Sequence, residues 1–233
     1  AAGVLADIPE TQAIPLLAQA IADPDPRVRL AVSKSAGKMK SAAVAVKVAA
    51  AVATETDPSV KEQQVKALGE IGSPATRDTL AQISEEPGRI GVIAAGSLIA
   101  VGDVSGKAKL DAAIAAPEVA LRLAAVQAAS MAKNLIVVPT LVVGLLDRVF
   151  EVRFTAAEGL AIFQAEKAAA VPVLNAALES KDDDLIGRAM AALTRLGEKL
   201  KDTLRTPAEM LESTDRRQRL AAVPIVREMP PSE

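Results

Sequence analysis

The chain has 233 residues, a formal net charge of −2, and no histidine, cysteine, tryptophan or tyrosine. Without these side chains the usual zinc sites, imidazole bases, thiol nucleophiles and aromatic platforms for nucleic-acid bases cannot form. Acidic and basic residues are interspersed, which argues against binding to nucleic acid or to an anionic membrane. No apolar run reaches the roughly 18 residues expected of a membrane-spanning helix, so we expect a soluble protein, whether cytoplasmic, periplasmic or secreted.

A start pattern, in which a branched apolar residue is often followed by a base, first occurs at Val28. It recurs at Val60, Ile90, Leu121, Val152 and Leu185, with steps of 32, 30, 31, 31 and 33 residues. We number positions in each repeat from this start residue. Position eight is apolar throughout, at Ala36, Leu68, Leu98, Ala129, Leu160 and Leu193, and so is position eleven, at Met39, Ile71, Val101, Ala132, Phe163 and Leu196. This regularity predicts stacked repeats, each with a second helix that buries one apolar stripe.

The residues upstream of each start predict a first helix and a turn. Pro15, Pro139 and Pro172 each lie thirteen residues before a start, where proline suits the first helical turn or a kink. Acidic residues stand three residues before four of the starts, at Asp25, Asp57, Glu118 and Asp182, where they can cap the second helix. Each repeat is therefore predicted to be a pair of short helices that hides its apolar stripe only by stacking on its neighbours.

These patterns predict one all-α domain over residues 1–233, an α-α superhelix (solenoid) of about six helical hairpins with a cap at each end. The predicted hairpins span about residues 11–40, 41–72, 73–103, 104–134, 135–165 and 166–198. Residues 1–10 are interpreted as the end of a further repeat. Residues 199–233 are interpreted as a degenerate seventh unit that closes the stack, because Gln218 and Arg219 echo the start pattern.

Two segments, AIPLLAQAIADPDPRVRLAVSKSAGKM and VPTLVVGLLDRVFEVRFTAAEGLAIF, resemble HEAT repeats of the short phycobilisome-lyase-like type, an armadillo-like helical fold. The resemblance covers residues 14 to about 197. It implies a ladder of ion pairs between neighbouring repeats, with acids at Asp23, Glu55, Glu85 and Asp147 and bases at Arg29, Lys61, Arg122 and Arg153. Gly91 and Ile186 replace the base in the third and sixth repeats, so the ladder is expected to be broken there. Glycines also interrupt the third repeat's second helix, which predicts a weak unit.

No catalytic constellation, cofactor site or metal site is evident. Two Ser-x-x-Lys sequences, beginning at Ser35 and Ser130, lack the companion motifs of penicillin-binding proteins and lie at equivalent repeat positions. The run Lys181 to Asp184 lacks the spacing of a calcium loop and is interpreted as a solvated helix cap. Arg216, Arg217 and Arg219 are interpreted as part of a soluble end. We therefore expect no enzymatic activity.

The candidate binding surface lies at position two, which a helical wheel places opposite the buried stripe. Apolar residues occupy this position in four of the six repeats, at Leu30, Val92, Leu123 and Phe154. Position six adds polar side chains, at Lys34, Lys66, Gln127 and Glu158. Small residues at position nine, such as Gly37, Gly69, Ser130 and Ala161, are expected to leave a groove open.

The sequence thus predicts a non-enzymatic scaffold that binds a protein or peptide along its concave face. Two other readings stay open at this point. The resemblance implies, as an alternative, a subunit related to bilin lyases or isomerases. The chain could also be a structural spacer of a larger protein.

Overall fold

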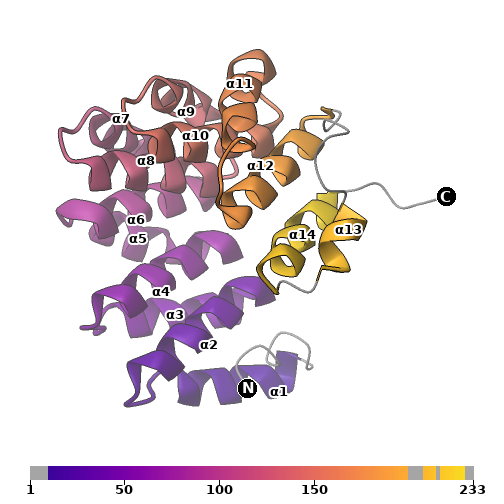
Figure 1. Ribbon diagram of the computed structural model, residues 1–233. Coiled ribbons are helices and arrows are strands. Elements are labelled where there is room, and N and C mark those ends of the chain that lie inside the picture. Colours follow the sequence, from indigo (N-terminus) through magenta and orange to yellow (C-terminus); the bar gives the residue numbers. More distant parts are fainter. Residues whose placement is uncertain (1–9, 199–206, 214–215, 229–233) are drawn as a thin grey trace. The chain divides into compact units, whose positions relative to one another are not determined.

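The computed structural model describes residues 10–198, 207–213 and 216–228, and every regular element in these ranges is helical (Figure 1). The chain falls into two compact units, residues 1–137 and 138–233, which are described separately. The all-α class is confirmed. A single uninterrupted stack through both units stays a prediction.

In the first unit, four pairs of helices follow one another along the chain. Their elements are α1 (Glu10–Ala20), α2 (Pro26–Met39), α3 (Ala42–Val52), α4 (Pro58–Ile71), η2 (Pro74–Thr76), α5 (Arg77–Ser84), α6 (Gly88–Ala100), η3 (Val104–Gly106), α7 (Lys107–Ile114), α8 (Val119–Met131) and η4 (Leu135–Val137). The second helices α2, α4, α6 and α8 pack against one another in sequence order (Figure 1).

The second unit continues the alternation of first and second helices. Its elements are α9 (Val138–Leu145), α10 (Phe150–Phe163), α11 (Lys167–Ala177), α12 (Asp183–Arg195), α13 (Pro207–Leu211) and α14 (Arg216–Glu228). Helix α14 packs on α12 and on the five-residue α13. Met190 and Ala191 of α12 form a buried apolar cluster with Met210, Ala222 and Ile225.

The predicted N-caps form at three of the four acidic positions. The carboxylates of Asp25, Asp57 and Asp182 accept hydrogen bonds from backbone amides in the first turns of α2, α4 and α12. Glu118 stands at the N-cap of α8 without a side-chain cap bond. Glutamate is outside the group of short side chains that favour this position, so its longer side chain accounts for the difference.

A second recurring device ends each second helix. Position twelve has a left-handed backbone in all six repeats, at Lys40, Gly72, Gly102, Lys133, Gln164 and Gly197, with φ between 50° and 97°. Glycine adopts this conformation without steric cost, whereas lysine and glutamine do not. All six second helices therefore end in the same left-handed conformation, even where the residue is lysine or glutamine instead of glycine.

The arginine at position one closes the turn between the two helices of a repeat. Arg29, Arg122 and Arg153 each donate a hydrogen bond to the backbone carbonyl six residues earlier. Arg219 makes the same bond to the carbonyl of Ser213. Arg219 thus makes the same bond as the arginines at position one of three earlier repeats. That α14 is the second helix of a seventh repeat stays a prediction.

Small residues let the second helices stack closely. A Cβ atom on Gly69 of α4 would lie 2.6 Å from the Ser97 hydroxyl of α6, and one on Gly96 of α6 would lie 2.5 Å from the Ala128 carbonyl oxygen of α8. Position eight is buried in all six repeats, as predicted. Close approach of the second helices therefore requires small residues at these contacts.

Candidate functional site

The apolar residues expected at the binding face are less accessible than the helical wheel indicates. Val92 and Phe154 are only 3% and 1% exposed. Leu30 and Leu123 are half-buried. An open row of four apolar anchors is therefore not present, because neighbouring helices cover two of them.

The cover over Phe154 comes from aromatic and cationic neighbours. Its ring stacks on Phe150 with centroids 6.1 Å apart. The guanidinium of Arg188, on α12, lies 5.0 Å from the centroid of the Phe154 ring. Arg188 is held there by Glu158 of α10, whose carboxylate accepts its guanidinium hydrogen bonds. Phe154 and Glu158 thus together bind the Arg188 guanidinium, a joint role that the sequence did not indicate.

The small residues at position nine do not leave a groove open. Gly37 packs under the Glu70 carboxylate and Gly69 packs under Ser97, both from the next second helix. Ala161 is fully buried. These side chains are small because a neighbouring helix rests on them, so the expectation of an open groove is wrong at these positions.

Two of the four polar residues at position six, Lys66 and Gln127, form part of a connected network across three second helices of the first unit. Arg89 of α6 donates to both carboxylate oxygens of Glu62 on α4, at 2.8 and 3.1 Å, and to Gln127 Oε1 on α8, at 2.7 Å. Lys66 Nζ donates to Glu62 Oε1 at 2.7 Å. We call Glu62, Lys66, Arg89 and Gln127 the three-helix network.

This network is partly exposed and charged. The side chains of Glu62, Lys66 and Arg89 are 20%, 24% and 35% exposed. Burial opposes the ionisation of Glu62, but the hydrogen bonds from Arg89 and Lys66 outweigh it and lower the pKa of the carboxyl. The Glu62 carboxylate is therefore held between two basic side chains in a fixed arrangement. Lys34, at the same position six of α2, is exposed.

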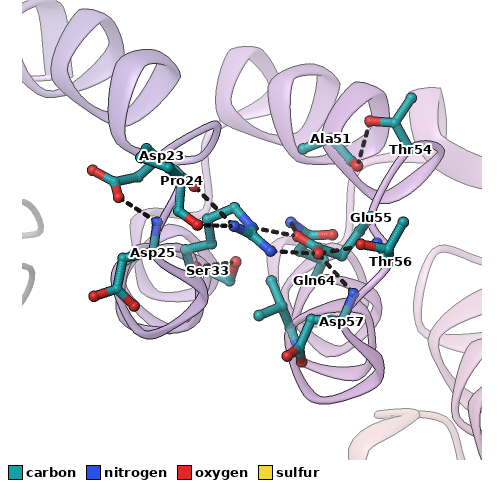
Figure 2. A network of polar contacts seen from close by, with 12 residues as sticks. Asp23, Pro24, Asp25, Ser33, Ala51, Thr54, Glu55, Thr56, Asp57 and Gln64 are labelled. Atoms are coloured by element: carbon teal, nitrogen blue, oxygen red, sulfur yellow. Dashed lines mark hydrogen bonds and ion pairs between the residues drawn. The ribbon is translucent and has the colours of Figure 1, made fainter.

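A second polar cluster lies between the turns of the first two repeats (Figure 2). Arg29 of α2 donates to both oxygens of Glu55, each at 2.8 Å, and to the carbonyl oxygens of Asp23 and Pro24. The Glu55 side chain is 4% exposed and also accepts hydrogen bonds from the amides of Thr56 and Asp57. The hydrogen bond from Arg29 is the main reason why the pKa of Glu55 lies below its usual range, against the opposing effect of burial.

A pocket of about 350 Å³ opens beside this ion pair. It is lined by Ile21, Ala22, Asp23, Pro24, Arg29, Ala51, Thr54, Glu55 and Thr56. Behind Glu55, the amide of Gln64 is fully buried, and its Oε1 atom has no hydrogen-bond partner. The Gln64 Nε2 atom lies 3.5 Å from Glu55 Oε2 (Figure 2). The cluster joins two repeats, and its polar groups point mainly at one another.

The predicted ladder is present in altered form. Arg29 pairs with Glu55 as expected, whereas Lys61 pairs with Glu86 instead of Glu85. In the third repeat, where Gly91 replaces the base, Lys109 of the following α7 donates to the carbonyl oxygens of Ser84 and Glu86. The missing cation is therefore supplied from the next repeat. The sequence could not indicate this, since the lysine lies outside the repeated position.

The remaining chemical motifs have local roles. Ser35 and Ser130 donate to the carbonyl oxygens of Ala31 and Val126 one helical turn earlier. Among the described residues there is no group of three or more metal-ligating side chains. None of the helices in the described ranges is both long and apolar enough to cross a membrane.

Comparison with known proteins supports the repeat type at one end of the chain. The family model of HEAT repeats matches residues 1–63, which supports a HEAT-repeat protein. The phycobilisome-lyase-like subtype stays a prediction. A search of curated proteins finds no match.

Two solved structures are similar over most of the chain. Human deoxyhypusine hydroxylase, in complex with glycerol, shares 19% identity at a TM-score of 0.43, covering 97% of this chain and 87% of that one. YibA of Escherichia coli shares 18% identity at a TM-score of 0.48, covering 97% and 85% of the two chains.

Proposed function

We propose that the chain is a non-enzymatic scaffold that binds a protein or peptide through its second helices, with the three-helix network as the recognition surface. The observation that carries this proposal is the chain of hydrogen bonds from Lys66 through Glu62 and Arg89 to Gln127. Charged side chains at a site of this kind usually lose conformational entropy on binding. Here that entropy is already lost in the free protein, because hydrogen bonds within α4 and between α4, α6 and α8 hold the side chains.

The chemistry of the network suits a polar partner surface. Arg89 uses two donors on Glu62 and one on Gln127, so its position is fixed from both sides. Fixed charges contribute more to specificity and to the rate of association than to raw affinity. Half-buried Leu30 and Leu123 on the same series of helices would add apolar contact.

The first experiment identifies the partner. A photo-crosslinking amino acid replaces Lys34, which is exposed, and a control carries it at Ala112, which is exposed on the first helix α7. A protein crosslinked at Lys34 and not at Ala112 is identified and purified for binding measurements.

The second experiment measures affinity of that purified partner. Arg89→Gln is expected to weaken binding at least about tenfold, which corresponds to about 1.4 kcal/mol. Lys107→Gln, which removes an ion pair to Asp111 on α7, is the matched control. Equal affinity of the Arg89 variant and the native chain, with unchanged helicity, would refute the proposed recognition surface.

A further inference from the structure

Helix α14 has a defined register within the repeat series. Because Arg219 makes the turn-closing bond to Ser213, Gln218 is the start residue of this repeat. Leu220 then occupies position two, Val223 position five and Ile225 position seven. Its faces can therefore be compared, position by position, with those of the six earlier second helices.

Consecutive second helices meet through the same positions. Ser97, at position seven of α6, donates to the carbonyl oxygen of Val65, at position five of α4. Ala128, at position seven of α8, packs on Gly96 at position six of α6. Ile225 of α14 lies in one buried cluster with Met190, at position five of α12. In these three pairs, position seven of one second helix packs on the face around position five of the preceding one, so the paired helices run parallel.

The face around position five is covered in every earlier repeat. The residues at this position are 0 to 1% exposed, namely Ser33, Val65, Ala95, Val126, Ala157 and Met190. On α14 the equivalent Val223 is 43% exposed and Leu220 is 59% exposed. The opposite face is closed, since Ala222 and Ile225 are 0% and 1% exposed. Helix α14, expected to close the series, therefore leaves open the face that receives a neighbouring helix elsewhere.

Basic residues border this open face. Arg216 and Arg227 are both exposed, one at each end of the helix. Val226, at the otherwise buried position eight, is also 43% exposed, which extends the apolar strip next to Val223. A helix that docks here meets an apolar centre flanked by positive charge.

We propose that the open face of α14 binds one further α-helix, one with a small residue at its centre and acidic residues in its first turn. The small residue corresponds to Ala128 or Ser97, which make this contact in the first unit. Acidic residues complement Arg216, because a parallel helix places its first turn beside the start of α14. This inference concerns a surface separate from the three-helix network and stands independently of the proposed function.

A stapled peptide with the sequence of residues 181–196, KDDDLIGRAMAALTRL, is the test ligand. It has one aspartate at its N-cap, two in its first turn, and Ala192 at position seven. The staple is needed because an isolated helix of this length is marginal in water. It is placed on the side opposite Ala192, and a fluorescent label reports binding to the full chain by anisotropy.

Saturable binding is expected for the native chain, and Val223→Glu is expected to weaken it at least tenfold. Val143→Glu changes an apolar residue of α9 that is 51% exposed, and it should leave binding unchanged. Because both positions are exposed, both variants should fold, which circular dichroism checks. Absence of binding to the native chain, or equal binding to the Val223 variant, would overturn the proposal.

Charge reversal tests the acidic part separately. Arg216→Glu should weaken binding of the peptide, and a peptide with lysines in place of its aspartates should bind the Arg216 variant better than the native chain. If the lysine peptide does not bind the Arg216 variant better than the native chain, the requirement for acidic residues is overturned. Sedimentation of the chain alone tests a second copy as the occupant. A dimer that Val223→Glu dissociates would show that a second copy of the chain covers this face, and it would overturn the proposed acidic helix as the occupant.

Discussion

Replacing Gly96 by alanine tests whether small residues set the spacing of the second helices. An added Cβ atom would lie 2.5 Å from the Ala128 carbonyl oxygen and 2.7 Å from the Ala128 Cβ atom. Real Cβ contacts stay beyond 3.0 Å, so α6 and α8 must separate by at least about 0.5 Å. Both opposing atoms belong to or adjoin the backbone and cannot rotate away.

The expected cost follows from two opposing effects. Alanine gains about 1 kcal/mol over glycine in a helix interior. Overpacking of a close contact costs about 1 to 3 kcal/mol, and rigid backbone neighbours favour the upper end of this range. Gly96→Ala should therefore lower the free energy of unfolding by about 2 kcal/mol, measured by urea denaturation with circular dichroism.

Gly37 provides the matched control, because the same substitution meets a movable neighbour there. Its added Cβ atom would lie 2.1 Å from the Glu70 carboxylate, which can rotate away, and 3.3 Å from the Ala67 Cα atom. Gly37→Ala should leave stability unchanged or raise it by up to about 1 kcal/mol. A Gly96→Ala protein as stable as the native one, or equal losses for the two variants, would refute the reasoning.

Three further predictions concern the caps and ion pairs. Gln164 ends α10 at φ +50°, so Gln164→Gly should raise the free energy of unfolding by about 1 kcal/mol in urea denaturation, and no gain would contradict the strain argument. The pKa of Glu62 is lower in the folded than in the unfolded chain, so its ionised form stabilises the fold above about pH 4.3, and this stability is lost as the pH falls through the folded-state pKa. Urea titrations at several pH values should show a flatter acid dependence for Glu62→Gln, and an unchanged curve would count against the ion pairs. Lys109→Met removes the ammonium that donates to the carbonyls of the α5–α6 turn, and it should lower the free energy of unfolding by about 1 to 2 kcal/mol in the same assay. Lys107→Met, whose partner Asp111 is exposed, should lower it by less.

The repeat register could be predicted because it reflects a local requirement of the backbone. The turn between two helices leaves carbonyls that an arginine at position one satisfies, and such an arginine recurs in three of the six repeats. Arg219, in the weaker echo of the start pattern, makes the same bond to a carbonyl six residues earlier. Burial at position eight was equally predictable, since that stripe faces the helix's own partner in the hairpin.

Exposure at position two could not be predicted from a helical wheel. The wheel compares one helix with one core, whereas a second helix in a stack also touches the second helices before and after it. On the helical wheel, Val92 and Phe154 point away from the hairpin core. Both are nevertheless buried. The replacement of the cation missing at Gly91 by Lys109 could not be predicted either, because the two residues lie in different repeats and share no repeat position.

Close stacking and the three-helix network depend on the same contact. Arg89 reaches Glu62 on one neighbouring helix and Gln127 on the other, which requires α4, α6 and α8 to lie close together. Gly96 allows that approach on the α8 side, where Ala128 follows Gln127 directly in the sequence. A larger residue at this site therefore moves the Gln127 amide away from Arg89 as it separates the helices. Small residues between the second helices thus have two effects: Gly37 and Gly69 deny the face an apolar groove, and Gly96 keeps the charged side chains of the network in register.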